Sequence, residues 1–184
     1  MTQNNPFGPD FENAHFSRLH QDAELIKTFV NWRDSKANIL FWGAKKTGQN
    51  IGNGKTYFCA ALWNFLKEHN ANVRAFNEND YYSAVKEVIS RGWDYNEHAK
   101  RLCEIKWLII DDLGSSKITD FTKECIYTLV DTRLNNNLPT LITSNLTLDD
   151  IKEIYTPRVH SRITAIKNTV VLTNEEDRRQ QKFD

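Results

Sequence analysis

The sequence predicts an α/β protein with a mainly parallel, five-stranded β-sheet and helices on both faces of the sheet. Two observations lead to this prediction. Short apolar segments alternate with longer segments in which apolar residues recur every three or four positions. This alternation is typical of a parallel sheet, because the chain has to return through a crossover before each new strand. The 184 residues, 40% of them apolar and 26% charged, are enough for one such domain.

The first half of the chain is expected to contribute two strands and three helices. Apolar residues at helical spacing predict the helices, and an apolar run closed by Gly43 predicts a fully buried first strand. In chain order the expected elements are a helix over 21–33, a strand over 39–42, a helix over 57–68, a strand over 73–76 and a helix over 80–90.

The second half is expected to contribute three more strands. Its elements are a short helix that ends near Cys103, a strand over 107–110, a helix over 121–135, a strand over 139–143 and a strand over 170–172. Thr147 and Asp150 have the spacing of a capping box, and Pro157 after Thr156 is typical of a first helical position. These signals predict helix starts between the last two strands.

Composition argues against several classes of protein. Lys plus Arg and Asp plus Glu each number 24, so binding of nucleic acid by bulk charge is not expected, although a local basic patch is compatible with zero net charge. The scattered Cys59, Cys103 and Cys125 form no zinc or disulfide pattern. The longest apolar run, 58–63, is far shorter than the roughly 20 residues that span a membrane. We expect a cytoplasmic protein, with a flexible tail over 1–10 and a single domain over 11–184.

A glycine-rich loop before the second expected helix indicates phosphate binding. Glycines allow backbone N–H groups to curl around phosphate oxygens, a lysine reaches the outer phosphates, and the next hydroxyl can ligate Mg²⁺. The candidate nucleotide-binding residues are Gly52, Asn53, Gly54, Lys55, Thr56 and Tyr57. The loop departs from the full P-loop pattern, because Gln49 occupies the first glycine position and the connection is long. A plain surface turn before a helix is the alternative.

Polar residues also follow two other expected strands. Asp111 and Asp112 come after four apolar residues, as in a Walker B strand, where the first carboxylate holds Mg²⁺ and the second polarises the attacking water. Asn145 ends the strand over 139–143 and could position that water. Because ligands bind beyond the carboxyl ends of parallel strands, these groups are expected to converge. The alternatives are acidic residues that bound a turn and an asparagine that satisfies loop backbone.

Two arginines are expected on one helical face. Arg158 and Arg162 lie four residues apart, and the planar guanidinium suits a phosphoryl group in transfer. If this face meets the nucleotide of a neighbouring subunit, one of them serves as an arginine finger. A solvated helix face is the alternative.

In order along the chain, these motifs resemble those of the DnaC-like helicase-loader ATPases, a branch of the AAA+ class of P-loop NTPases that includes IstB-type transposition helpers. The matching segments are Phe-Glu-Asn at 11–13, Asn-Ile-Leu-Phe-Trp-Gly at 38–43, Gly-Lys-Thr at 54–56, Leu-Ile-Ile-Asp-Asp-Leu-Gly at 108–114, Leu-Pro-Thr-Leu-Ile-Thr-Ser-Asn-Leu at 138–146 and the arginines at 158 and 162. The resemblance covers about residues 11 to 184 and implies an AAA+ domain without a separate lid.

The resemblance also implies roles for individual residues. Lys55 and Thr56 would hold phosphate and Mg²⁺, Asp111 would bind the metal and Asp112 would act as base. The remaining implied roles are Asn145 as first sensor, Arg162 as arginine finger, Arg158 as its helper and Arg178 or Arg179 as a late sensor. The implied cofactors are ATP and Mg²⁺. The implied partners are a replicative helicase or a transposase, single-stranded DNA, and further copies of the chain when ATP is bound.

Three functions are therefore carried forward. The first is an ATPase that loads or remodels a replicative helicase on single-stranded DNA, with a transposition helper ATPase as its variant. The second is a nucleotide-gated adaptor with little hydrolysis, which the altered P-loop favours. The third is a small-molecule kinase, for which the Ser-Asn strand end is not expected. A candidate set for stacking on DNA bases comprises Tyr81, Tyr82, Lys86, Arg91, Trp93 and Tyr95, although aromatic residues at such spacing are more often part of a core.

Overall fold

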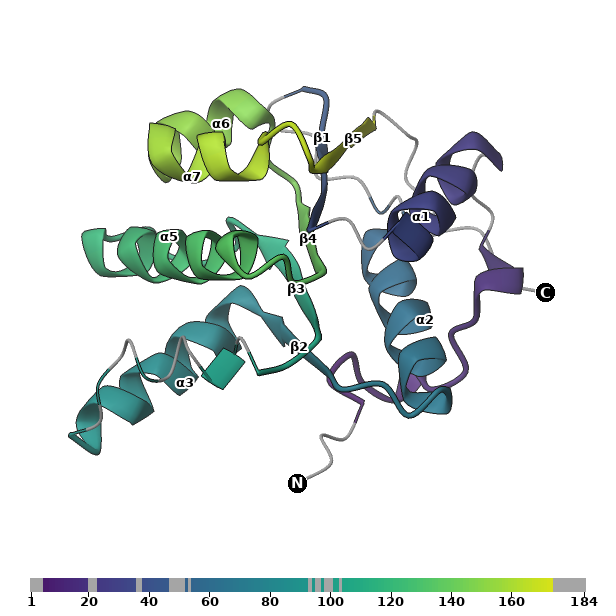
Figure 1. Cartoon of the computed structure of the whole chain (residues 1–184), viewed down its shortest axis with the longest axis horizontal. Helices are drawn as coiled ribbons and strands as arrows, with labels where there is room; N and C mark the ends of the chain where they lie inside the picture. Colours follow the sequence, from purple (N-terminus) through teal and green to yellow (C-terminus); the bar gives the residue numbers. More distant parts are fainter. Residues whose placement is uncertain are drawn as a thin grey trace.

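The fold is a five-stranded parallel sheet between two layers of helices (Figure 1). The computed structural model describes residues 5–19, 23–35, 38–46, 52, 54–92, 94, 97, 101–102 and 104–173. The strands are β1 (Ile39–Ala44), β2 (Val73–Asn77), β3 (Trp107–Leu113), β4 (Thr140–Ser144) and β5 (Thr169–Thr173). They lie in the order β2-β3-β4-β1-β5, and every neighbouring pair is parallel. The predicted fold class is confirmed.

Helices of the described part of the chain cover both faces of the sheet (Figure 1). On the first face lie α1 (Ala23–Ser35) and α2 (Lys55–Glu68). On the second lie α3 (Glu78–Ser90), α5 (Asp120–Asn135), α6 (Leu148–Ile154) and α7 (Pro157–Ile163). The capping box at Thr147 and the proline at the start of α7 are present as the sequence predicts.

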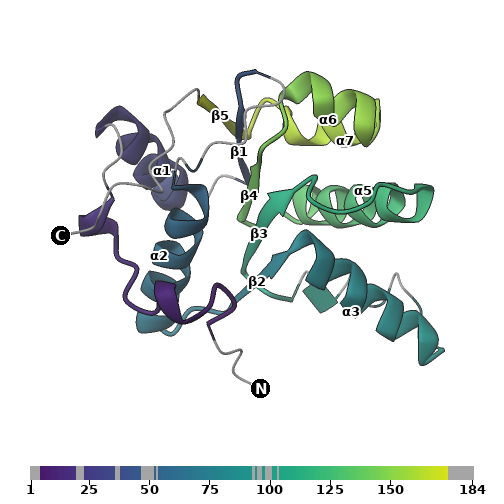
Figure 2. The same ribbon diagram turned by 180° about the vertical axis from the view of Figure 1, so that it is seen from behind.

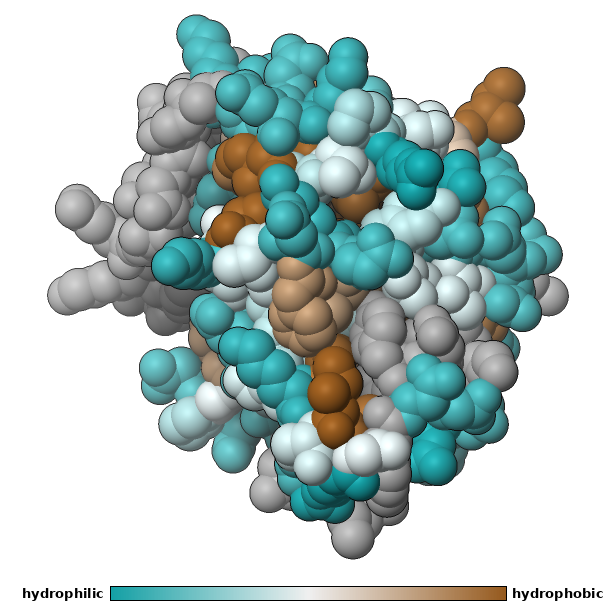
Figure 3. All heavy atoms as spheres, turned by 90° about the vertical axis from the view of Figure 1, so that its left-hand side faces the viewer, coloured by the Kyte–Doolittle hydropathy of each residue, from teal (hydrophilic) through white to brown (hydrophobic). Residues whose placement is uncertain are grey.

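Alternating side chains of each strand enter two separate cores. In β3, Leu108 and Ile110 pack with α5, whereas Trp107 and Ile109 pack with α2. Because both faces are covered, β1 and the first four residues of β3 are continuous buried apolar runs, whereas burial alternates along the edge strand β2. The surface on the left-hand side of Figure 1, where α3, α5, α6 and α7 lie, carries separated apolar groups among hydrophilic ones (Figure 3).

A segment before α1 lies along α2, as both ribbon views show (Figures 1 and 2). It contains the short helices η1 (Pro9–Phe11) and η2 (Phe16–Arg18). The side-chain amide nitrogen of Asn64 lies within 3.2 Å of the carbonyl oxygens of three residues of this segment, Phe11, Glu12 and Ala14. Phe7, within the expected tail, packs against the core around α2.

The fully buried Arg133 on α5 ties together the chain segments that lead into β3 and β4. Its guanidinium donates to the carbonyl oxygens of Leu102, Ile105, Lys106 and Pro139 and to the hydroxyl of Thr140. These bonds satisfy a buried charge and fix the edge of the sheet where the strands begin. The opposite edge, where the strands end, carries the polar motifs.

Among the described residues, no helix combines the length and the apolar character needed to cross a membrane.

Candidate functional site

The start of α2 presents backbone N–H groups beyond the end of β1. Gly54 is the N-cap with φ of +86°, in the left-handed region where a residue with a Cβ is disfavoured, and no side chain caps the helix there. Lys55 follows as the first helical residue and is buried. A helix N-terminus carries partial positive charge, so this geometry suits an anion.

The expected phosphate loop is only partly described. Gly52, Gly54 and Thr56 are half-buried, while Gln49 and Asn53 lie outside the described residues. Tyr57 is directed at the segment before α1, because its hydroxyl oxygen accepts the His15 backbone N–H at 3.2 Å. Tyr57 is thus a contact of the amino-terminal segment in this structure.

Asp111 lies buried at the end of β3, against α2 and β4. Its Oδ1 accepts a hydrogen bond from the Thr143 hydroxyl at 2.5 Å and one from the Cys59 thiol at 3.6 Å. Burial raises the pKa of the Cys59 thiol well above its usual value, and the charge of Asp111 raises it further, whereas the charge of Lys55 lowers it. Cys59 therefore stays a neutral donor, and it lies within the fields of both Lys55 and Asp111.

Asp112 and Asn145 are in direct contact across β3 and β4. The Asn145 side-chain amide donates to Asp112 Oδ1 at 2.9 Å, and both residues are half-buried. The end of β4 is also joined to β1, because the Ala44 N–H donates to the Leu146 carbonyl at 3.0 Å. The ends of β1, β3 and β4 and the start of α2 thus lie at one edge of the sheet.

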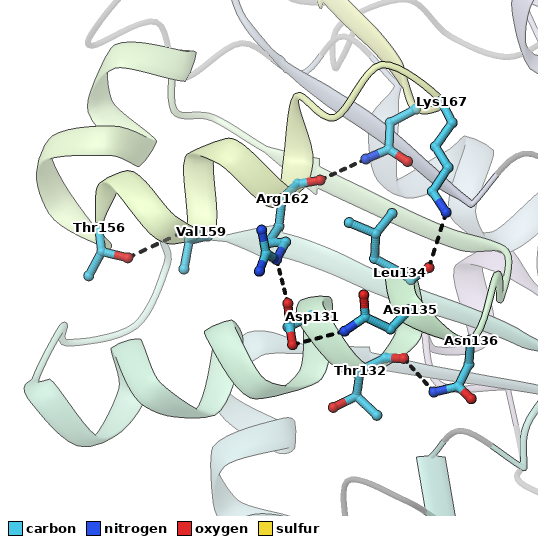
Figure 4. Close-up of polar contacts among 10 residues, drawn as sticks. Asp131, Thr132, Leu134, Asn135, Asn136, Thr156, Val159, Arg162 and Lys167 are labelled. Carbon is cyan, nitrogen blue, oxygen red and sulfur yellow. Dashed lines mark hydrogen bonds and ion pairs between the residues drawn. The ribbon is translucent and has the colours of Figure 1, made fainter.

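Arg158 and Arg162 share one face of α7 that is directed at Tyr127 of α5, and Figure 4 shows Arg162 pointing to Asp131 of the same helix. Their guanidinium carbons lie 5.8 and 6.0 Å from the centre of the Tyr127 ring. Arg162 Nε donates to Asp131 Oδ1, and this bond raises the pKa of Arg162. The contacts described for the two guanidinium groups are therefore on α5, apart from the strand ends of the same chain.

Glu78 is a buried residue at the site that the sequence analysis did not single out. Its Oε2 accepts the backbone N–H groups of Gly114 at 3.0 Å and Ser116 at 2.9 Å, in the loop directly after β3. Its Oε1 accepts the hydroxyls of Tyr82 and Tyr155. Burial, followed by the interactions with Glu78, raises the pKa of both phenols above the usual range. In the sequence, Glu78 looks like an ordinary acidic residue in a first helical turn.

Of the two alternatives for Tyr81 and Tyr82, base stacking is wrong and core packing is confirmed. Both are buried, and Tyr81 donates to the Cys125 carbonyl at 3.2 Å, because they lie on the side of α3 that packs on the sheet. Lys86 on α3 and Arg91, the C-cap that follows this helix, are exposed. Trp93 and Tyr95 lie outside the described residues, as do Arg178 and Arg179.

Comparison with known proteins identifies a family and a fold. A family model described as IstB-like ATP binding protein matches residues 6–182. The replicative helicase loader DnaC of Escherichia coli K12 is 25% identical over 124 residues, which are 67% of this chain and 51% of the relative. The corresponding protein of Buchnera aphidicola is 24% identical over 173 residues, 89% of this chain and 68% of the relative. The chain thus spans about half the length of the Escherichia coli relative.

Solved structures show the same fold. A DnaC helicase loader superposes with a TM-score of 0.71 at 22% identity, over 90% of this chain and 99% of that chain. DnaI gives 0.71 at 22% identity, over 94% and 95% of the two chains. DnaA bound to AMPPCP and single-stranded DNA gives 0.72 at 15% identity, over 91% and 52%. The P-loop AAA+ fold predicted from the sequence is confirmed.

Proposed function

The chain belongs to the family of IstB-like ATP binding proteins, and from this premise we propose that it is a Mg²⁺-dependent ATPase of the helicase-loader type. The observation that carries the proposal is the meeting of three groups at one edge of the sheet. These groups are the left-handed Gly54 at the start of α2, the acidic pair at the end of β3 and the amide of Asn145.

The residues present fit a magnesium ion beside a nucleotide. Both hydrogen bonds that the described residues give the Asp111 carboxylate fall on Oδ1, so Oδ2 is the oxygen for a cation or its water. The Thr56 hydroxyl, at the first turn of α2, is the second protein ligand in the proposal. No group of three or more His, Cys, Asp or Glu side chains suited to a metal occurs among the described residues, so phosphate oxygens would complete the shell. When bound, Mg²⁺ neutralises negative charge on the phosphates.

The chain's own residues perform the remaining steps in this proposal. The backbone from Gly54 onward and the Lys55 ammonium hold the phosphates. Asp112 orients the attacking water, and Asn145 fixes the Asp112 carboxylate through the 2.9 Å hydrogen bond. Arg162 of a neighbouring subunit, with Arg158 beside it, stabilises the charge that develops during transfer.

The proposed biological role is based on the names of the relatives and of one structural neighbour. Two relatives are named replicative helicase loaders, and one neighbour with this fold is bound to single-stranded DNA. We therefore propose a replicative helicase or a transposase as partner, single-stranded DNA as ligand, and a cytoplasmic homo-oligomer with ATP. The domain over 11–184 is the unit that carries these activities in the proposal.

A nucleotide-gated adaptor with little hydrolysis is the second candidate. Gln49 at the first glycine position of the phosphate loop favours it, because a side chain there changes how closely the backbone approaches phosphate. ATP binding without turnover, with DNA and helicase present, would select this candidate.

Steady-state ATP hydrolysis tests the main proposal. Lys55→Ala and Asp112→Asn should each lower the rate at least about tenfold, since each removes a charge from the reacting phosphate or water. Lys152→Ala and Asp149→Asn make the same changes at exposed positions of α6 and should leave the rate unchanged. Equal rates for the wild type and the first two variants would refute hydrolysis at this site.

Co-purification with the replicative helicase tests the role. The proposal predicts recovery of the complex with ATP and loss of the complex with ADP or without nucleotide. Equal recovery of the complex with ATP, with ADP and without nucleotide would contradict the proposed role.

A further inference from the structure

The ladder between β3 and β4 contains a β-bulge at the acidic pair. Ile110 pairs with Ile142, and the next aligned pair is Leu113 with Ser144. Two residues of β3 therefore lie opposite a single residue of β4, Thr143. A bulge of this kind re-aims side chains and leaves backbone groups without their ladder partners.

The bulge changes which side chains of β3 face the site. Asp112 has φ of +58°, a left-handed conformation that is unfavourable for a residue with a Cβ. Before the bulge, Ile110 packs in the core beside α5; after it, Leu113 enters that same core, although strict alternation would direct it to the opposite face. The extra residue is therefore absorbed at Asp111 and Asp112, and both carboxylates remain at the strand end.

One hydroxyl group bonds to both acidic residues. Thr143 Oγ1 accepts the backbone N–H of Asp112 at 3.0 Å and donates its proton to Asp111 Oδ1 at 2.5 Å. Thr143 itself is fully buried. A hydroxyl can do both at once, because it has one proton and two lone pairs.

We propose that Thr143 is a positioning residue, which sets the Asp111 carboxylate toward the cation and holds Asp112 in its left-handed conformation toward the attacking water. The inference rests on the proposed function. Without the hydroxyl, the Asp112 N–H loses its bond to Thr143, and Asp111 Oδ1 loses the shorter of its two described hydrogen bonds, which leaves the one from the Cys59 thiol at 3.6 Å. Both carboxylates then lose the contact that fixes their direction.

Three substitutions distinguish the effect of the Thr143 hydroxyl from the effect of side-chain shape. Thr143→Val keeps the shape and removes the hydroxyl, whereas Thr143→Ser keeps the hydroxyl and removes a methyl group. Thr169→Val makes the same chemical change in β5, at a partly buried position away from the strand-end site. If Thr143 served only for packing, the serine variant, which loses a methyl group, would be impaired as much as the valine variant, which loses the hydroxyl.

Amide hydrogen exchange in the nucleotide-free wild type tests the geometry first. The Asp112 amide should exchange at least about tenfold more slowly than an open amide, since it is bonded to a buried hydroxyl. In Thr143→Val, exchange at Asp112 should accelerate, while the amides of β5 stay unchanged. Exchange of the wild-type Asp112 amide at the rate of an open loop would overturn the proposal, whether or not the valine variant folds.

Nucleotide binding and kinetics test the consequence. In Thr143→Val, kcat should fall about tenfold or more with the KM for ATP within about twofold, because the lost bonds direct the acidic pair and do not hold the nucleotide. The Mg²⁺ concentration for half-maximal binding of a fluorescent ATP analogue should rise several-fold. Thr143→Ser and Thr169→Val should behave as the wild type.

The outcomes distinguish this inference from the proposed function. A wild type that binds no ATP and hydrolyses none would refute the proposed function itself. A wild type with Mg²⁺-dependent ATP turnover, together with a valine variant of unchanged kcat and Mg²⁺ requirement, would refute the role of Thr143 alone. Equal losses in the serine and valine variants would show a role in packing and would also contradict the proposal.

Discussion

Replacing Glu78 by alanine removes the acceptor of four hydrogen bonds from a fully buried position. The donors are the N–H groups of Gly114 and Ser116 and the hydroxyls of Tyr82 and Tyr155. A buried group left without its partner costs about 1–3 kcal/mol. Water that enters the space, and the removal of a buried charge, offset part of this loss. We expect a loss of about 4 kcal/mol in the free energy of unfolding.

Urea denaturation followed by circular dichroism measures this quantity. The Glu78→Gln variant keeps one acceptor oxygen and most of the shape, so it should lose about 2 kcal/mol. Glu87→Ala is the matched control on the same helix, where an exposed pair with Arg91 contributes less than about 1 kcal/mol. A Glu78→Ala protein within about 1 kcal/mol of the wild type, with an unchanged m value, would refute the hydrogen-bond account of this position.

Three further predictions concern the site. Gly54→Ala should cost about 1–2 kcal/mol of stability, because φ is +86° there, and a fluorescent ATP titration should show weaker binding; equal affinity would contradict the phosphate role of this turn. The pKa of the Cys59 thiol is raised in the folded state, so the folded chain keeps a proton that the unfolded chain releases above pH 9.0, and stability should fall by about 1.4 kcal/mol per pH unit there. Urea titrations at pH 8 to 10 should show a shallower fall in Cys59→Ala, and parallel curves would contradict this. Mixing Arg162→Ala with Lys55→Ala protein should restore ATP hydrolysis that neither has alone, since each subunit supplies what its neighbour lacks; an inactive mixture would count against an arginine that acts between subunits.

The sequence was sufficient to predict the fold and the location of the strand-end residues. Parallel strands read as continuous apolar runs, and their carboxyl ends meet at one edge, so the neighbourhood of Asp111, Asp112 and Asn145 follows from order along the chain. The helical spacing of Arg158 and Arg162 likewise predicted that both lie on one face, which the shared Tyr127 ring confirms.

Other features depend on pairing between distant segments and could not be predicted. The bulge at Asp112 exists only in the register of β3 against β4, 31 residues apart. Glu78 acquires its role from loops that come close only in the folded chain. For Tyr81 and Tyr82 the sequence left base stacking and core packing both open, and only the packing of α3 on the sheet decides for the core. The Asp131 partner of Arg162 comes from the packing of α7 on α5 (Figure 4).

An ¹⁵N chemical-shift titration with Mg²⁺ and a non-hydrolysable ATP analogue tests most directly whether the turn at Gly54, the acidic pair at the end of β3 and Asn145 form one nucleotide site. We expect the amides of residues 54–57, 111–113 and 145 to shift together, with a single dissociation constant, while those of 138–140 at the opposite edge of the sheet do not. Shifts confined to other surfaces, or shifts at residues 54–57 without any at 111–113 and 145, would contradict a common nucleotide site.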